Sequence, residues 1–130
     1  MKAELQYLVW TTVLTGLLWI PYIIDRAMVR GVQDAMGYPE NPKPGAPWAQ
    51  RLQKAHYNAV ENLVLFAALV LTAHAIGLST PAIGTAAAVY FWARVAHAVV
   101  YTFGIPWLRT ISWTVGWVAL AVIAWQIITR

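Results

Sequence analysis

The chain has 130 residues, of which 60% are hydrophobic and only 11% are charged, and it contains no Cys. Soluble domains are about one quarter charged, so this balance predicts a protein that sits in lipid rather than in water. The absence of Cys excludes a disulfide framework, a thiolate metal site and a cysteine nucleophile. Any thiol chemistry would therefore need a thiol from outside the protein.

The first apolar segment covers residues 5–24 and carries no charge. Its length is about the 20 residues that a helix needs to cross the hydrocarbon core of a bilayer. The residues after it offer no small-residue cleavage site of the kind that ends a secretory signal. We therefore expect this segment to remain in the protein as a membrane span.

The longest polar stretch covers residues 33–50 and contains Pro39, Pro42, Pro44 and Pro47. Proline lacks a backbone N–H and clashes with the preceding helical turn, so prolines this close together predict a loop. A plain connector and a functional lid are equally compatible with this composition.

Three more apolar segments follow, at residues 55–77, 82–103 and 107–128. Only "GLSTP" separates the second span from the third, so these two helices are expected to be antiparallel neighbours. The loops leave no room for a second domain. The sequence thus predicts an all-α integral membrane protein, a four-transmembrane-helix bundle in which residues 1–130 form one domain.

The distribution of Lys and Arg predicts the orientation. The first loop with its flanks and the third connection hold most of the cations, namely Arg26, Arg30, Lys43, Arg51, Lys54 and Arg109. The opposite side has only Lys2 and Arg130. The positive-inside bias then puts the Pro-rich loop in the cytoplasm and both termini outside. The net charge of +4 reflects this orientation, and no nucleic-acid partner is expected.

Two polar stripes run along the second and third spans. Arg51, Lys54, Asn58 and Glu61 are spaced i, i+3, i+7 and i+10, so they share one face of a helix. On the third span, the spacing i, i+4, i+7 and i+11 aligns another set, which consists of Tyr90, Arg94, His97 and Tyr101. A charge near the bilayer centre costs roughly 2.5–3.5 kcal/mol on insertion scales, so both stripes should face protein or water.

Because the second and third helices are neighbours, we expect Glu61 to neutralise Arg94, with Asn58 and His97 completing a polar seam. A purely structural role is equally open, since a buried pair can simply fix the register of two helices. The presence of Arg109 at the start of the fourth span is explained by default if its long side chain reaches the lipid headgroups.

Several of these groups have ordinary explanations when taken singly. His97 alone is more typical of a core histidine than of a ligand, and His56 and His74 lie near opposite ends of one span, so no metal site is expected. Taken together, the cations at the cytoplasmic end of the spans are expected to form a basic pocket in the membrane. Such a pocket favours an anionic ligand.

The segment "RLQKAHYNAVENLVLF" resembles the signature of the MAPEG family, the membrane-associated proteins in eicosanoid and glutathione metabolism, with its pattern R-A-x-x-N-x-x-E-N. The segment "ARVAHAVVYTFGIPWLRTISWTVGW" resembles the family's R-x-x-H-x-x-x-Y block with a downstream Arg. The resemblance covers nearly the whole chain and is to a bacterial-type member, which implies the bacterial inner membrane with periplasmic termini.

The resemblance implies a homotrimer that holds glutathione between neighbouring subunits near the cytoplasmic face. Carried over to this sequence, the family's polar site residues fall on Arg51, Asn58, Glu61, Arg94, His97, Tyr101 and Arg109. Arg26 or Arg30 is the candidate for an arginine that a neighbouring subunit contributes. Guanidinium groups suit the two carboxylates of glutathione, while Asn58 and Glu61 suit its amide and amino groups.

The activity implied is a glutathione transferase or peroxidase that acts on small, lipid-soluble electrophiles arriving from the bilayer. Arg109 is the first candidate to stabilise the thiolate of glutathione, and Tyr101 is the second. Lys54, Tyr57 and Trp113 depart from the family pattern, and Lys54 keeps the charge of an Arg without its two-pronged hydrogen bonding. The alternative is a non-catalytic scaffold whose basic pocket binds an anionic lipid headgroup or another small anion.

Overall fold

The computed structural model describes residues 1–130 and consists of helices joined by turns and loops. The helices are α1 (Ala3–Leu17), α2 (Trp19–Arg30), α3 (Val32–Met36), α4 (Pro47–Ala75), α5 (Pro81–Thr102) and α6 (Pro106–Ile128). Four segments are long and apolar enough to cross a membrane: α1 with α2, α4, α5 and α6. The predictions of an all-α fold and of four spans are confirmed.

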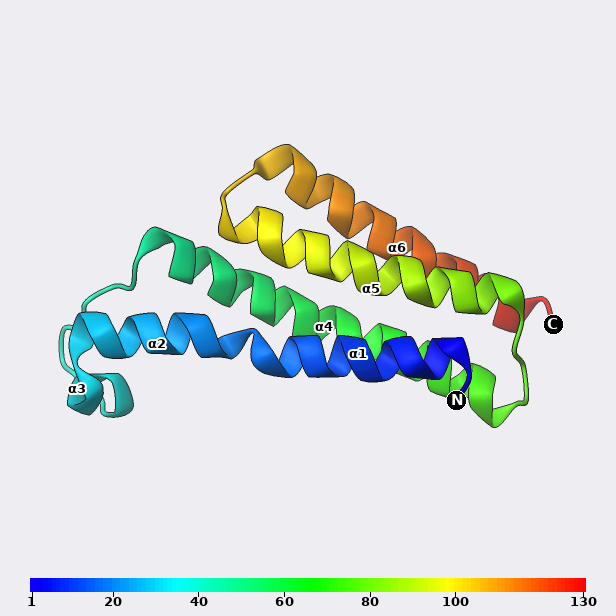
Figure 1. The fold of residues 1–130 in the computed structure, drawn as a ribbon, viewed down its shortest axis with the longest axis horizontal. Helices are drawn as coiled ribbons and strands as arrows, with labels where there is room; N and C mark the ends of the chain where they lie inside the picture. The colour runs from blue at the N-terminus through cyan, green and yellow to red at the C-terminus, as the bar shows by residue number, and fades with distance from the viewer.

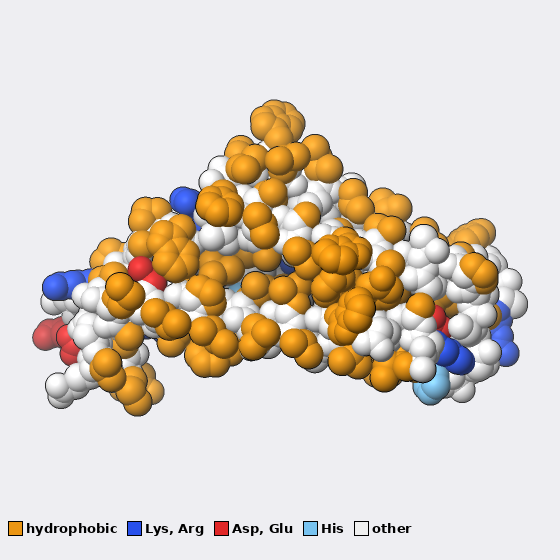
Figure 2. Space-filling view, in the orientation of Figure 1, with side chains coloured by type: hydrophobic (Ala, Val, Ile, Leu, Met, Phe, Trp, Pro, Cys, Tyr) orange, Lys and Arg blue, Asp and Glu red, His pale blue; other side chains and the backbone are white.

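The long helices run side by side along one axis, with both termini at the same end of the bundle (Figure 1). The opposite end, which we call the loop end, carries α3, the Pro-rich loop before α4 and the turn between α5 and α6. Hydrophobic side chains cover much of the face shown in Figure 2, as expected for a protein surrounded by lipid.

The observed helices extend beyond the predicted spans. The first helical segment reaches Arg30 instead of residue 24, and it breaks at Leu18. Pro21 explains the break, because it has no N–H to donate to the carbonyl four residues earlier, at Leu17. The second span also begins earlier than residue 55, since α4 starts at Pro47, where a proline fits the first turn of a helix.

The 33–50 stretch is accordingly only partly a loop, because α3 ends at Met36 and α4 begins at Pro47. Asp25 on α2 fixes the end of this loop: its Oδ2 accepts a hydrogen bond from the backbone N–H of Ala46 at 3.0 Å. A Cβ at Gly45 would lie 2.8 Å from the same oxygen, so a larger residue there would displace the Asp25 carboxylate from this hydrogen bond. This contact sets where α4 starts relative to α2.

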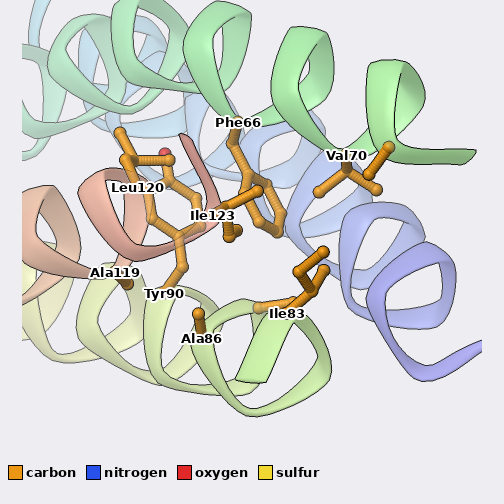
Figure 3. Close-up of a cluster of buried hydrophobic side chains, with 10 residues drawn as sticks. Phe66, Val70, Ile83, Ala86, Tyr90, Ala119, Leu120 and Ile123 are labelled. Carbon is orange, nitrogen blue, oxygen red and sulfur yellow. The ribbon is translucent and has the colours of Figure 1, made fainter. Parts of the chain in front are cut away.

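The core lies among α4, α5 and α6. Phe66 on α4 stacks on Tyr90 of α5, with ring centroids 4.1 Å apart and planes inclined by 26° (Figure 3). Gly116 on α6 faces Ala93 and Tyr90 on α5, and a Cβ at Gly116 would lie 3.7 Å from the Ala93 Cβ and from the Tyr90 ring, an ordinary van der Waals distance. Small residues at such positions allow membrane helices to pack at short range.

Candidate functional site

Two adjoining cavities lie at the loop end, between α4, α5 and α6. The first, of about 220 Å³, is lined by Arg51, Lys54, Tyr101, Gly104, Ile105, Pro106 and Arg109. The second, of about 330 Å³, is lined by Asn58, His97, Tyr101, Arg109, Thr110 and Trp113. Tyr101 and Arg109 line both cavities, so we treat the two as one candidate site.

Arg109 and Tyr101 meet where the two cavities join. The Cζ atom of Arg109 lies 5.0 Å from the centroid of the Tyr101 ring, a distance at which a cation and an aromatic face attract each other. His97 packs edge-on against the Tyr101 ring, and the two ring centroids are 5.4 Å apart. The Tyr101 ring therefore holds Arg109 near the middle of the site.

Arg51 reaches the site from the first turns of α4. Its Nε donates a hydrogen bond at 2.9 Å to the carbonyl of Thr102, the last residue of α5. Carbonyls at a helix C-terminus lack partners within the helix, and a cation there also interacts favourably with the helix dipole. Gly104 has φ +72° and a Cβ there would lie 3.2 Å from the Arg51 Nε, so glycine makes room for this side chain.

Arg94 lies behind the site and is 3% exposed. It donates a hydrogen bond at 2.7 Å to Asn58 Oδ1 and lies 3.3 Å from Nδ1 of His97. Its Nε atom has no partner, and neither does the buried hydroxyl of Tyr90 one turn earlier on α5. The predicted seam of Asn58, Arg94 and His97 between the two helices is therefore present.

The expected ion pair between Glu61 and Arg94 is absent. Arg94 makes its contacts with Asn58 and His97 instead, and Glu61 is exposed on the outer surface of α4. The sequence could not decide which of the two residues contacts Arg94. Residues 58 and 61 point only about 60° apart around a helix with 3.6 residues per turn. Asn58 points toward α5, whereas Glu61 points away from the helix bundle.

Arg26 and Arg30 do not line the candidate site within the subunit. They line a separate polar cavity of about 190 Å³ between α2, the Pro-rich loop and the start of α4. The Nε of Arg30 donates a hydrogen bond at 2.7 Å to the carbonyl of Lys43, which ties it to its own loop. Any role of these two residues in the site would require a second subunit.

Two residues that line the second cavity were absent from the predicted site set, Thr110 and Trp113. The spacing of Trp113 was the available signal, since it lies four residues after Arg109 on α6 and can share its face. Thr110 directly follows Arg109, so spacing gave no such signal for it. The Thr110 hydroxyl donates a hydrogen bond at 3.3 Å to the Pro106 carbonyl, and its lone pairs remain available to a ligand. Trp113 adds a large aromatic wall to an otherwise polar cavity.

The charge of the site is one-sided. Arg51, Lys54 and Arg109 line it, Arg94 lies directly behind it, and no Asp or Glu lines either cavity. Several cations gathered in one place, with no carboxylate beside them, attract an anion. The geometry is therefore suited to a ligand with one or more carboxylate, phosphate or thiolate groups.

The chain has no match among curated proteins. A model of the MAPEG family matches residues 7–129, which includes every helix that builds the site. The four apolar spans, the polar seam between α4 and α5 and the cationic cavities at the loop end thus occur in a chain that belongs to the MAPEG family.

Proposed function

We propose that the protein is a glutathione-dependent transferase or peroxidase that acts on lipid-soluble electrophiles. The observation that carries the proposal is the convergence of Arg51, Lys54 and Arg109 on two cavities that share Tyr101. Membership of the MAPEG family fits a glutathione-related activity of this kind. Glutathione has two carboxylates and a thiol, which suits an anion site with three separate cations.

In this proposal the protein activates the thiol through electrostatics. A free thiol has a pKa of about 8.5, and a guanidinium beside it lowers that pKa by stabilising the thiolate. Arg109 is the candidate for this role, because it lies in the middle of the site and Tyr101 holds it there. The thiolate then forms an S–C bond with an electrophilic carbon, either displacing a leaving group or adding to a double bond that takes up a proton. With a hydroperoxide, the thiolate forms an S–O bond as the O–O bond breaks, and the departing alkoxide takes up a proton to become an alcohol. A second glutathione then reduces the resulting sulfenic acid to the disulfide and water.

We also propose that the site is completed by neighbouring subunits of a homotrimer. Glu61 lies near the middle of the α4 span and is exposed on the subunit surface. A carboxylate is costly in contact with lipid at that depth, so another subunit is the best explanation of how it is covered. Glu61 would then face the junction between subunits, where it can bind the amino group of glutathione.

The test is a titration of the purified protein with glutathione, followed by the ultraviolet absorbance of the thiolate. The wild type is expected to give a saturable thiolate signal near neutral pH, and Arg109→Ala is expected to lose it. Arg130→Ala, at the opposite end of the bundle, is the matched control and should behave like the wild type. A thiolate signal that survives in Arg109→Ala would remove Arg109 from the mechanism.

One observation favours the second candidate function, the binding of an anionic lipid headgroup. Lys54 and Arg109 are exposed in the single subunit, as a headgroup site open to the leaflet would require. The same titration separates the two functions. Absence of both binding heat and thiolate signal with glutathione, together with binding of phosphatidylglycerol in nanodiscs, would support the lipid-binding scaffold.

A further inference from the structure

Apolar side chains stand out from the loop end, at the junction of α2 and α3. Val32 is 65% exposed, Met36 is 82% exposed and Tyr38 is fully exposed. Met28, in the last turn of α2, is 80% exposed. Figure 2 shows hydrophobic side chains at this end, next to charged ones. None of these residues lines the candidate site, so the proposed function does not account for them.

The helix α3 has one apolar face and one polar face. Val32 and Met36 are four residues apart, so they lie on the same face of the helix. Asp34 lies about 160–200° away from both around the helix axis, which places it on the opposite face. A short helix of this pattern is suited to lie flat at a boundary between an apolar medium and water.

The helix α3 directly follows the first apolar segment that is long enough to cross a membrane. The span formed by α1 and α2 ends at Arg30, and Gly31, with φ +81°, then turns the chain into α3. The helix lies beside the end of α2, on the side away from α5 and α6 (Figure 1). Arg30 holds the returning loop by its hydrogen bond to the Lys43 carbonyl, and no residue of the subunit covers Val32 or Met36.

The charges of this region do not favour an electrostatic attachment. Residues 25–43 contain three basic side chains (Arg26, Arg30, Lys43) and three acidic ones (Asp25, Asp34, Glu40), which sum to zero. Attraction to the membrane therefore has to come from the apolar side chains. Tyr38 fits this setting, because tyrosine favours the headgroup level, where its ring is apolar and its hydroxyl is wet.

We propose that α3 lies on the membrane surface at the loop end, with Val32 and Met36 inserted at the level where headgroups meet acyl chains. The partner is the lipid bilayer itself, and anionic lipid is not required. The arrangement continues the lipid-facing surface of α2 around the Gly31 turn and fixes the first part of the connection to α4.

The absence of Cys allows a direct test, because a single introduced cysteine can be labelled without a background. Met36→Cys and Asp34→Cys are each labelled with a nitroxide and reconstituted in phosphatidylcholine vesicles, with and without phosphatidylglycerol. Electron paramagnetic resonance power saturation then compares contact with oxygen, which concentrates in lipid, and with a water-soluble nickel chelate. Asp34 is the matched control, since it is exposed on the same short helix but on its other face.

The expected result is that the label at position 36 is at least threefold more accessible to oxygen than to the nickel chelate, whereas the label at 34 shows the reverse. The result should be the same in both lipid mixtures. Equal access of the chelate to both labels would overturn the proposal by placing α3 in water. Protection of the label at 36 from both reagents would also overturn it, because that outcome means that another copy of the chain covers this face.

Discussion

The Nε of Arg51 donates a hydrogen bond to the carbonyl of Thr102 at 2.9 Å, so one of the cations of the candidate site also closes the C-terminal end of α5. The same side chain therefore shapes the turn that leads to Arg109. One residue thus contributes a positive charge to the candidate site and also caps the helix that precedes the α5–α6 turn.

Replacement of Arg51 by Ala is expected to lower both affinity and stability. Loss of a hydrogen bond from a charged group costs about 1.5–3 kcal/mol, so the free energy of unfolding should fall by roughly that amount. Lys54→Ala is the control, because Lys54 lines the same cavity but is exposed. It should weaken glutathione binding while leaving unfolding in sodium dodecyl sulfate unchanged. Equal stability of the two variants would contradict the capping role of Arg51.

The hydrogen bond that Asn58 accepts from the buried guanidinium of Arg94 is expected to be required for the stability of the fold. Asn58→Ala removes the acceptor at 2.7 Å and leaves the charge without its neutral partner, which should cost about 2–3 kcal/mol or more. Asn58→Asp should fold better than Asn58→Ala, because it supplies a counter-charge, yet it should bind glutathione more weakly than the wild type. Thermal unfolding and calorimetric titration of the three proteins check this. An Asn58→Ala variant that is as stable as the wild type, or more stable, would disprove this role of Asn58.

Two tyrosines with similar burial should respond differently to loss of the hydroxyl. The Tyr90 hydroxyl is buried without a partner, so Tyr90→Phe should leave the melting temperature unchanged or raise it. The Tyr22 hydroxyl lies 2.7 Å from Nδ1 of His56, which links α2 to α4, so Tyr22→Phe should cost about 1 kcal/mol. Thermal unfolding of both variants in the same detergent makes the comparison. A larger loss of melting temperature in Tyr90→Phe than in Tyr22→Phe would mean that the Tyr90 hydroxyl forms a hydrogen bond in the purified protein.

Gly104→Ala is expected to destabilise the α5–α6 turn and the site together. Its φ of +72° disfavours any residue with a Cβ, and that Cβ would also lie 3.2 Å from the Arg51 Nε. We expect a loss of about 1–2 kcal/mol from the backbone alone, with weaker binding of glutathione. Gly16→Ala in α1 is the control, since a Cβ there meets nothing within 4 Å. It should be neutral or slightly stabilising.

The fold was largely predictable because the spans are marked by long runs of apolar residues. The residues at which the helices begin and end were less predictable. Hydropathy identifies the lipid-buried part of α4, but the helix starts at Pro47, where polar residues continue it beyond the hydrocarbon. The break at Leu18 follows from Pro21, a signal that was present in the sequence but was hidden inside an uninterrupted apolar run.

The composition of the candidate site followed from spacing, but its pairing did not. Helical periodicity placed Asn58 and Arg94 on facing stripes, and the structure brings them together. Periodicity alone could not decide between Asn58 and Glu61 as the partner, because that choice depends on how α4 is rotated against α5. Small contacts set this rotation, such as the Phe66–Tyr90 stack, and they have no signature in a single sequence.

The buried Arg94, which has an amide rather than a carboxylate as its partner, has a consequence for the thermodynamics of the whole protein. The interior of the helix bundle therefore holds a positive charge that no carboxylate of the chain neutralises. An anion in the adjoining cavities would lower the electrostatic energy of the folded state without touching that side chain. Such an anion would also stabilise the fold by mass action, so that a hundredfold excess of ligand over its Kd should add about 2.7 kcal/mol to the free energy of unfolding.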